Sequence, residues 1–272
     1  MILQKFENVT FYSAIEMMLY AVIIGYLFLL FMFFITMRYR TSKKLYWLFF
    51  SILFLCLAIA RTIFIIHYFF IPEMSTSQSD IVLWLMLTYR LATFFSWLAI
   101  GCFMGVLGIL LFPPEAVEGK ESTTEGFTLT PLMKLVLRLI LIGIPIAIGI
   151  ITLILPDNLL MDPDMAEEYN LNINIQTIWG YPAGRFVLLI GVILFTFIIP
   201  FLFIYLAVKT YGVLRKSYLL NAIGILLYYL GRILQGVFDI SGNPHFEAIV
   251  PPIIILCALL VMVIANNYEQ LR

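Results

Sequence analysis

Long apolar stretches alternate with short polar ones along the whole chain. A membrane core of about 30 Å is crossed by about 20 helical residues, each rising about 1.5 Å. Seven stretches reach about that length, and they cover residues 14–37, 45–71, 81–112, 132–155, 181–208, 217–239 and 248–266. The pattern predicts an all-α fold in which residues 1–272 form a single polytopic domain, a bundle of seven transmembrane helices.

The composition agrees with this prediction. Hydrophobic residues make up 63% of the 272 residues and charged residues 12%, whereas soluble domains have about 45–50% and about 25%. Lysine plus arginine and aspartate plus glutamate number 16 each, so the overall charge provides no attraction to nucleic acid. We therefore expect the lipid bilayer to be the main partner and a cell membrane to be the location.

Basic residues in the connecting segments predict the orientation, because cytoplasmic loops carry an excess of lysine and arginine. They cluster after the first and fifth stretches, as Arg38, Arg40, Lys43 and Lys44, and as Lys209, Arg215 and Lys216. Segments 72–80 and 157–169 contain acidic residues and no basic ones, and we expect the second of these to be a solvated loop. The N-terminus is thus expected outside and the C-terminus in the cytoplasm.

The sixth stretch carries a regular stripe of polar or small residues. They recur every three or four positions and so share one helix face. The stripe consists of Asn221, Gly224, Tyr228, Arg232, Gln235 and Asp239. We expect this face to point into the bundle, while apolar residues such as Ile223, Leu226 and Ile233 face lipid.

Further arginines lie in the predicted outer half of the membrane. Arg61 and Arg90 are roughly 13–15 Å from the outer ends of their stretches at 1.5 Å per residue, and Arg185 and Arg232 are shallower. Guanidinium groups recognise carboxylates and phosphates, and aromatic rings form the walls of ligand pockets. We therefore expect a pocket for a small anionic ligand. The candidate ligand-binding residues are Arg61, Tyr89, Arg90, Trp97, Arg185, Tyr228, Arg232, Gln235 and Asp239.

The same arginines have a structural alternative, which the sequence leaves open. An arginine near a helix end can extend to the lipid headgroups, and one inside a bundle can pair with an acid such as Asp239 or Glu16. The depth of Arg61 and Arg90 favours binding, because it makes contact with the headgroups harder.

The sequence contains no pattern that indicates catalysis or a cofactor. It lacks H-E-x-x-H, G-x-S-x-G and a phosphate-binding loop, so we expect no enzymatic activity. His67 and His245 lack the spacing of a metal or haem site and are interpreted as interfacial residues. The three cysteines lie inside apolar stretches, where thiols pack as small hydrophobic groups.

The chain leaves the last apolar stretch through residues 265–272, which read Ala-Asn-Asn-Tyr-Glu-Gln-Leu-Arg. With the seven-helix topology, this exit resembles the sensory membrane regions that precede histidine kinase and related signalling domains in prokaryotes. The resemblance implies a sensor that passes a signal to a cytoplasmic signalling partner or acts as a homo-oligomer.

Two other functions remain as alternatives to a sensor. The first is a small-solute transporter or channel subunit, and the second is a structural subunit of a membrane complex. Transport favours polar groups through the full membrane depth and an inverted internal repeat, whereas polarity here is concentrated in the outer half. A sensor is expected to have a closed inner half.

Overall fold

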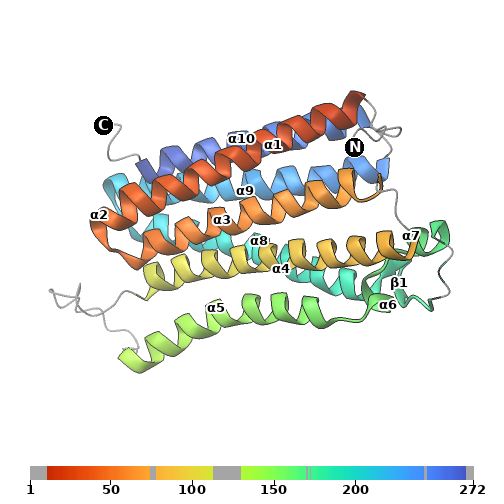
Figure 1. Ribbon diagram of the computed structural model, residues 1–272. Coiled ribbons are helices and arrows are strands. Elements are labelled where there is room, and N and C mark those ends of the chain that lie inside the picture. Colours follow the sequence, from red (N-terminus) through yellow and green to blue (C-terminus); the bar gives the residue numbers. More distant parts are fainter. Residues whose placement is uncertain are drawn as a thin grey trace.

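The protein is an all-α bundle. A computed structural model describes residues 11–73, 78–112, 130–169, 171, 173–241 and 244–267, with residues 78, 79, 168, 236, 237, 239–241, 244 and 247 described by their backbone alone. Seven helices in these ranges are long and apolar enough to cross a membrane (Figure 1), which confirms the predicted polytopic helical fold. They are α1 (Phe11–Phe33), α3 (Leu45–Ile65), α4 (Gln78–Leu111), α5 (Pro131–Ile154), α8 (Ala183–Lys209), α9 (Gly212–Ser241) and α10 (Pro244–Asn267).

Local chemistry explains where several helices begin or end. Two of the long helices continue directly into a short π-helix. α1 continues into η1 (Phe34–Tyr39), which is followed by α2 (Arg40–Ser42), and α3 continues into η2 (Ile66–Phe70). Lys43 then adopts a left-handed conformation with φ of 55° and stops α2. At α5, Thr130 caps the first turn by accepting from the Met133 N–H, and Pro131 begins the helix, as its fixed φ favours.

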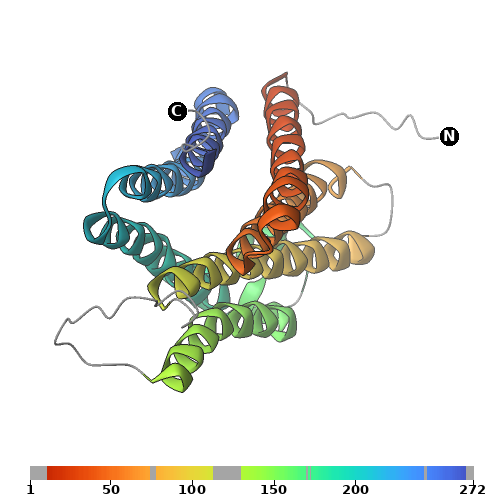
Figure 2. The same cartoon turned by 90° about the vertical axis from the view of Figure 1, so that its left-hand side faces the viewer.

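Six of the long helices form a ring, and the seventh lies outside it. The neighbours around the ring are α4, α3, α1, α10, α9 and α8, with α8 returning to α4, and α5 packs on the outside of α4. Viewed end-on, α8, α9 and α10 form one side of the bundle and α1, α3 and α4 the other (Figure 2). The N-terminal and C-terminal parts of the chain thus each supply one side.

Close packing joins the helices away from the polar residues. Phe34 stacks on Trp47 and Phe54 with ring centroids 5.5 Å apart in both pairs, and both phenylalanines are fully buried. At Gly224, an added Cβ would lie 2.6 Å from Cγ of Met262, so α9 and α10 approach more closely than a side chain there would allow. Such contacts are the main source of helix association in lipid, where apolar burial gives little driving force.

The connection between α5 and α8 folds over one end of the bundle. This cap segment, residues 155–182, contains α6 (Asp157–Leu160), α7 (Pro163–Glu168) and an antiparallel pair of short strands, β1 (Thr177–Ile178) and β2 (Tyr181–Pro182). Trp179 and Gly180 both have positive φ, 54° and 79°, as a tight two-residue hairpin turn requires.

The prediction that residues 157–169 form a solvated loop is therefore wrong. Leu160 and Met161 are almost completely buried against the bundle, and they anchor a folded segment. Figure 1 shows this segment at the same end as the start of α1, which we call the cap end.

Candidate functional site

A pocket of about 460 Å³ lies at the cap end, between the two sides of the bundle. Its polar lining comes from α1, α3, β2 and α9, as Glu16, Tyr20, Arg61, Tyr181, Arg232 and Gln235. Its remaining walls come from α3 and η2, as Phe64, Ile65, Tyr68 and Phe69. Pockets that hold small organic molecules have about this size and this mixture of aromatic walls with a few polar groups.

Arg61 is the most deeply buried charged residue of the pocket, with 5% of its surface exposed. Its Cζ lies 4.9 Å from the ring centroid of Tyr20, which orients the guanidinium by a cation–π contact. Two of its nitrogens, Nε and Nη2, have no hydrogen-bond acceptor among the described residues, and neither has the Tyr20 hydroxyl. Unsatisfied donors are costly in a buried place, and no described residue supplies an acceptor for these groups.

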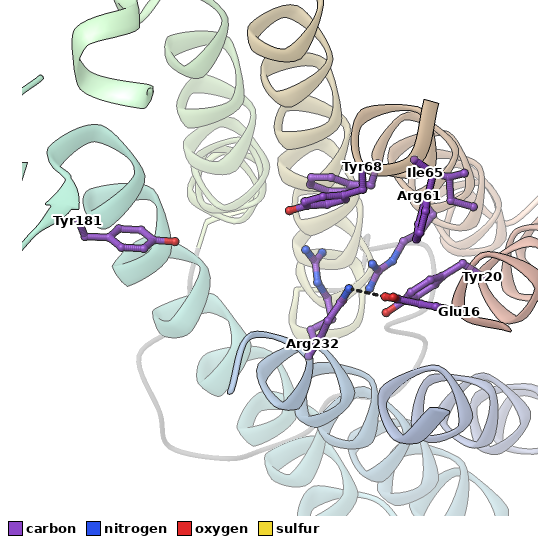
Figure 3. Close-up of a pocket in the computed structure, with 10 residues that line it drawn as sticks. Glu16, Tyr20, Arg61, Ile65, Tyr68, Tyr181 and Arg232 are labelled. Carbon is purple, nitrogen blue, oxygen red and sulfur yellow. Dashed lines mark hydrogen bonds between the residues drawn. The ribbon is translucent and has the colours of Figure 1, made fainter. Parts of the chain in front are cut away.

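Arg232 approaches the same pocket from α9. Its Cζ lies 5.9 Å from the ring centroid of Phe64, and its positive charge is near enough to repel that of Arg61. Figure 3 shows the two guanidinium groups entering the pocket from different helices. The predicted inward stripe of α9 thus brings Arg232 and Gln235 to the pocket, whereas Ile223, on another face of α9, is exposed.

The pocket contains one carboxylate among its described lining residues, that of Glu16. The Gln235 Nε2 group donates to Glu16 Oε1 at 3.5 Å, a contact that joins α9 to α1. Glu16 and Tyr20 were not among the candidate ligand-binding residues from sequence. The signal for them was present, because residues four apart share one face of a helix.

The structure assigns Arg90 a different place from the predicted one. Its Nη2 donates at 2.6 Å to the Leu155 carbonyl and at 2.6 Å to Asp157 Oδ1. Both partners belong to the cap segment, and Arg90 is not among the described residues that line the pocket. The guanidinium extends toward the helix end, as the structural alternative described, because a carboxylate and a free carbonyl are available there.

Arg185 also contacts the cap segment, and Tyr89 packs against Arg185. Arg185 donates through Nε to the Leu160 carbonyl and through Nη1 to Asp162 Oδ2, the latter at 3.4 Å. Its Cζ lies 4.2 Å from the Tyr89 ring centroid. Neither residue is among the described residues that line the pocket, and each has a partner outside it.

The remaining candidates do not reach the pocket or cannot be placed in it. Trp97 is fully buried and packs edge to face on Phe195 at 5.8 Å between centroids, so it belongs to the helix packing. Tyr228 is buried with its hydroxyl close to the Arg61 guanidinium, but it is not among the described residues that line the pocket. The side chain of Asp239 lies outside the described residues.

His67 is buried within the bundle, with 6% of its surface exposed. Its Nδ1 lies 3.0 Å from the Thr88 hydroxyl, which itself donates to the Trp84 carbonyl at 2.7 Å. This histidine links η2 to α4.

A second polar cluster joins helix ends at the opposite end of the bundle. Asn266 of α10 donates to Asn221 Oδ1 at 3.0 Å and accepts from the Tyr46 hydroxyl at 3.2 Å. Arg38 of η1 donates to Asn267 Oδ1 at 2.6 Å and to the Asn266 carbonyl at 3.2 Å. We call these five residues the asparagine cluster. They connect η1, α3, α9 and α10, whereas the sequence stripe had singled out Asn221 alone.

Comparisons of the chain with protein-family models, with curated proteins and with solved structures found no match.

Proposed function

We propose that this protein is a membrane sensor that binds a small anionic ligand in the pocket at the cap end of its bundle. The observation that carries the proposal is the environment of Arg61. Arg61 is buried, with 5% of its surface exposed, and two of its nitrogens have no acceptor among the described residues. It lines a pocket of about 460 Å³ together with a second arginine, Arg232. A carboxylate or phosphate oxygen would satisfy these donors and relieve the repulsion between Arg61 and Arg232.

The proposal places the cap end outside the cell. Basic residues surround the other end, where Arg38, Arg40, Lys43 and Lys44 follow α1 and Lys209 ends α8. The cap segment carries acidic residues such as Asp157, Asp162 and Asp164. Cytoplasmic segments retain positive charge, so the pocket would receive its ligand from the external side.

The filling of the opposite half favours a sensor over a transporter. Phe34 of η1 and Phe50 and Phe54 of α3 are fully buried and pack on one another, and the asparagine cluster joins four helical segments at the same end of the bundle. Transport requires a second route out of the pocket, and these side chains occupy the space between the helices. The cluster also connects α10 to the pocket-bearing helices, which supports transmission of a signal to the last helix.

Thermal unfolding of the purified protein in lipid nanodiscs tests the binding. A ligand at 100 times its Kd stabilises a protein by about 2.7 kcal/mol, so a panel of organic acids and phosphorylated metabolites should reveal a class that raises the Tm. Arg61→Lys and Arg232→Lys should lose most of this shift, because lysine keeps the charge but not the two-pronged geometry.

Arg90→Lys is the matched control, since it makes the same change outside the pocket and should retain the ligand-dependent shift. Absence of any shift in the wild-type protein across the panel would overturn the binding proposal. Ligand flux into sealed vesicles that contain the protein would favour a transporter instead.

A further inference from the structure

The charges and walls of the pocket restrict the class of ligand further, in an inference that rests on the proposed function. Among the described lining residues, two guanidinium groups are opposed by one carboxylate, that of Glu16. The charged groups therefore sum to one positive charge. A ligand with a single negative charge balances this sum, whereas one with two negative charges places its second charge near Glu16 without a matching cation.

The walls indicate that the rest of the ligand is apolar. Phe64, Ile65 and Phe69 come from one side of α3 and η2, and the ring of Tyr20 lies under Arg61. A small inorganic ion would occupy only a small part of the volume of about 460 Å³ and would leave the space beside these side chains unfilled. Aromatic and aliphatic groups fill such space favourably.

The two ends of the pocket differ in burial, and this difference indicates how a bound ligand would be oriented. Arg61 and Tyr20 are buried at 5% and 4% exposure, whereas Tyr68 and Tyr181 are exposed at 61% and 45%. The Arg61 nitrogens and the Tyr20 hydroxyl that have no partner among the described residues thus lie at the closed part of the pocket. The charged group of the ligand goes to this closed part, and its apolar body extends toward Tyr68 and Tyr181.

We infer that the pocket selects a singly charged oxyanion on an apolar body, with Arg61 and Arg232 sharing the oxyanion and Glu16 excluding ligands of higher charge. A soluble monocarboxylate has this chemistry, and so does the phosphodiester of an anionic lipid such as phosphatidylglycerol. Glu16 acts through its charge, and Gln235 Nε2 lies 3.5 Å from its Oε1.

The first test compares probes that differ in charge or in body. Binding to the protein in phosphatidylcholine nanodiscs is measured for phenylacetate, its uncharged amide, acetate, succinate and inorganic phosphate. Phenylacetate should bind most tightly, with acetate weaker for lack of an apolar body and the amide weaker for lack of charge. Tighter binding of succinate or phosphate than of phenylacetate would overturn this inference while leaving anion binding in place. If none of the probes binds, the proposed function itself fails.

Two single substitutions at the same contact test the role of charge in opposite directions. Glu16→Gln removes the negative charge and should raise succinate affinity on the order of tenfold, since a like charge at short range no longer opposes the second carboxylate. Gln235→Glu adds a negative charge and should weaken phenylacetate by a similar factor. Damage to the fold would weaken binding in both variants, so it cannot produce the opposite changes. An unaltered preference in Glu16→Gln would overturn the selection by Glu16.

The last arm separates the two sources of the oxyanion. Phosphatidylglycerol is added to the nanodiscs, and phenylacetate binding is measured again. Weaker apparent phenylacetate binding that requires both Arg61 and Arg232 would identify the lipid as an occupant of the pocket. Unchanged binding would identify a soluble monocarboxylate as the ligand. Competition that persists in Arg61→Lys and Arg232→Lys would contradict the assignment of the two arginines to the oxyanion.

Discussion

Arg90 of α4 and Asp157 of α6 form an ion pair of 2.6 Å that fastens the cap segment to the bundle. The arginine side chain is 23% exposed and the aspartate 51%, so water screens the pair. Arg90 also donates to the Leu155 carbonyl, just beyond the end of α5. The guanidinium therefore holds both the end of one helix and the beginning of the next.

The two partners should contribute unequally to stability. Asp157→Asn should lower the free energy of unfolding by about 0.2–1 kcal/mol, the range for exposed ion pairs. Arg90→Met should cost about 1–3 kcal/mol more, because it also leaves the Leu155 carbonyl without its donor. Thermal unfolding in nanodiscs measures both effects. Equal losses in the two variants would show that the Leu155 contact is unimportant.

The asparagine cluster should stabilise the opposite end of the bundle. Asn266→Ala removes contacts to both Asn221 and Tyr46, and hydrogen bonds between membrane helices average about 0.6 kcal/mol each. We therefore expect a loss of about 1–2 kcal/mol in unfolding free energy.

Tyr46→Phe is the matched variant for this cluster, because it removes one of the two contacts and almost no volume. Its expected cost is about 0.6 kcal/mol. Phenylacetate affinity should remain unchanged in Tyr46→Phe if the cluster acts on stability alone, and should change if α10 couples the cluster to the pocket. A cost in Tyr46→Phe as large as that of Asn266→Ala would contradict the assigned contacts.

The helices and the inward face of α9 could be predicted because each depends on a local pattern. Apolar length identifies a membrane helix, and the spacing of Asn221, Arg232 and Gln235 defines a face without reference to any neighbour. The same logic would have brought Glu16 and Tyr20 together on α1. Arg61 lines the pocket, as its depth in the bundle leaves its side chain few other directions.

The partners of Arg90 and Arg185 could not be predicted, because they depend on how the cap segment folds back. Sequence spacing places Arg90 at a depth but does not show that Leu155 and Asp157 come within 2.6 Å of it. The acidic residues of the cap segment suggested solvent exposure, whereas Leu160 and Met161 between them decide the packing. A few apolar positions within a polar segment thus determined the partners of Arg90 and Arg185.

Glycine at position 224 should be needed for the approach of α9 to α10. Gly224→Ala puts a methyl group 2.6 Å from Met262 Cγ and 3.1 Å from the Ala258 carbonyl, and overpacking of this kind costs about 1–3 kcal/mol. Gly143→Ala in α5 is the control, since nothing lies within 4 Å of its added Cβ. It should not destabilise the protein, because alanine favours a helix more than glycine does. Equal unfolding temperatures for the two variants would indicate that α9 and α10 are not in close contact.

The proposed orientation predicts opposite accessibility for two exposed positions in a variant that lacks the native cysteines. Lys44 precedes α3 among the basic residues, and Asp164 lies in α7 of the cap segment. Because positively charged segments stay in the cytoplasm, we expect position 44 inside the cell and position 164 outside it. An impermeant maleimide added to intact cells should therefore label Asp164→Cys and leave Lys44→Cys unlabelled until the membrane is permeabilised. The permeabilised sample is the control for reactivity, because both cysteines must react there. Labelling of position 44 but not of position 164 in intact cells would invert the bundle, and the pocket would then receive its ligand from the cytoplasm.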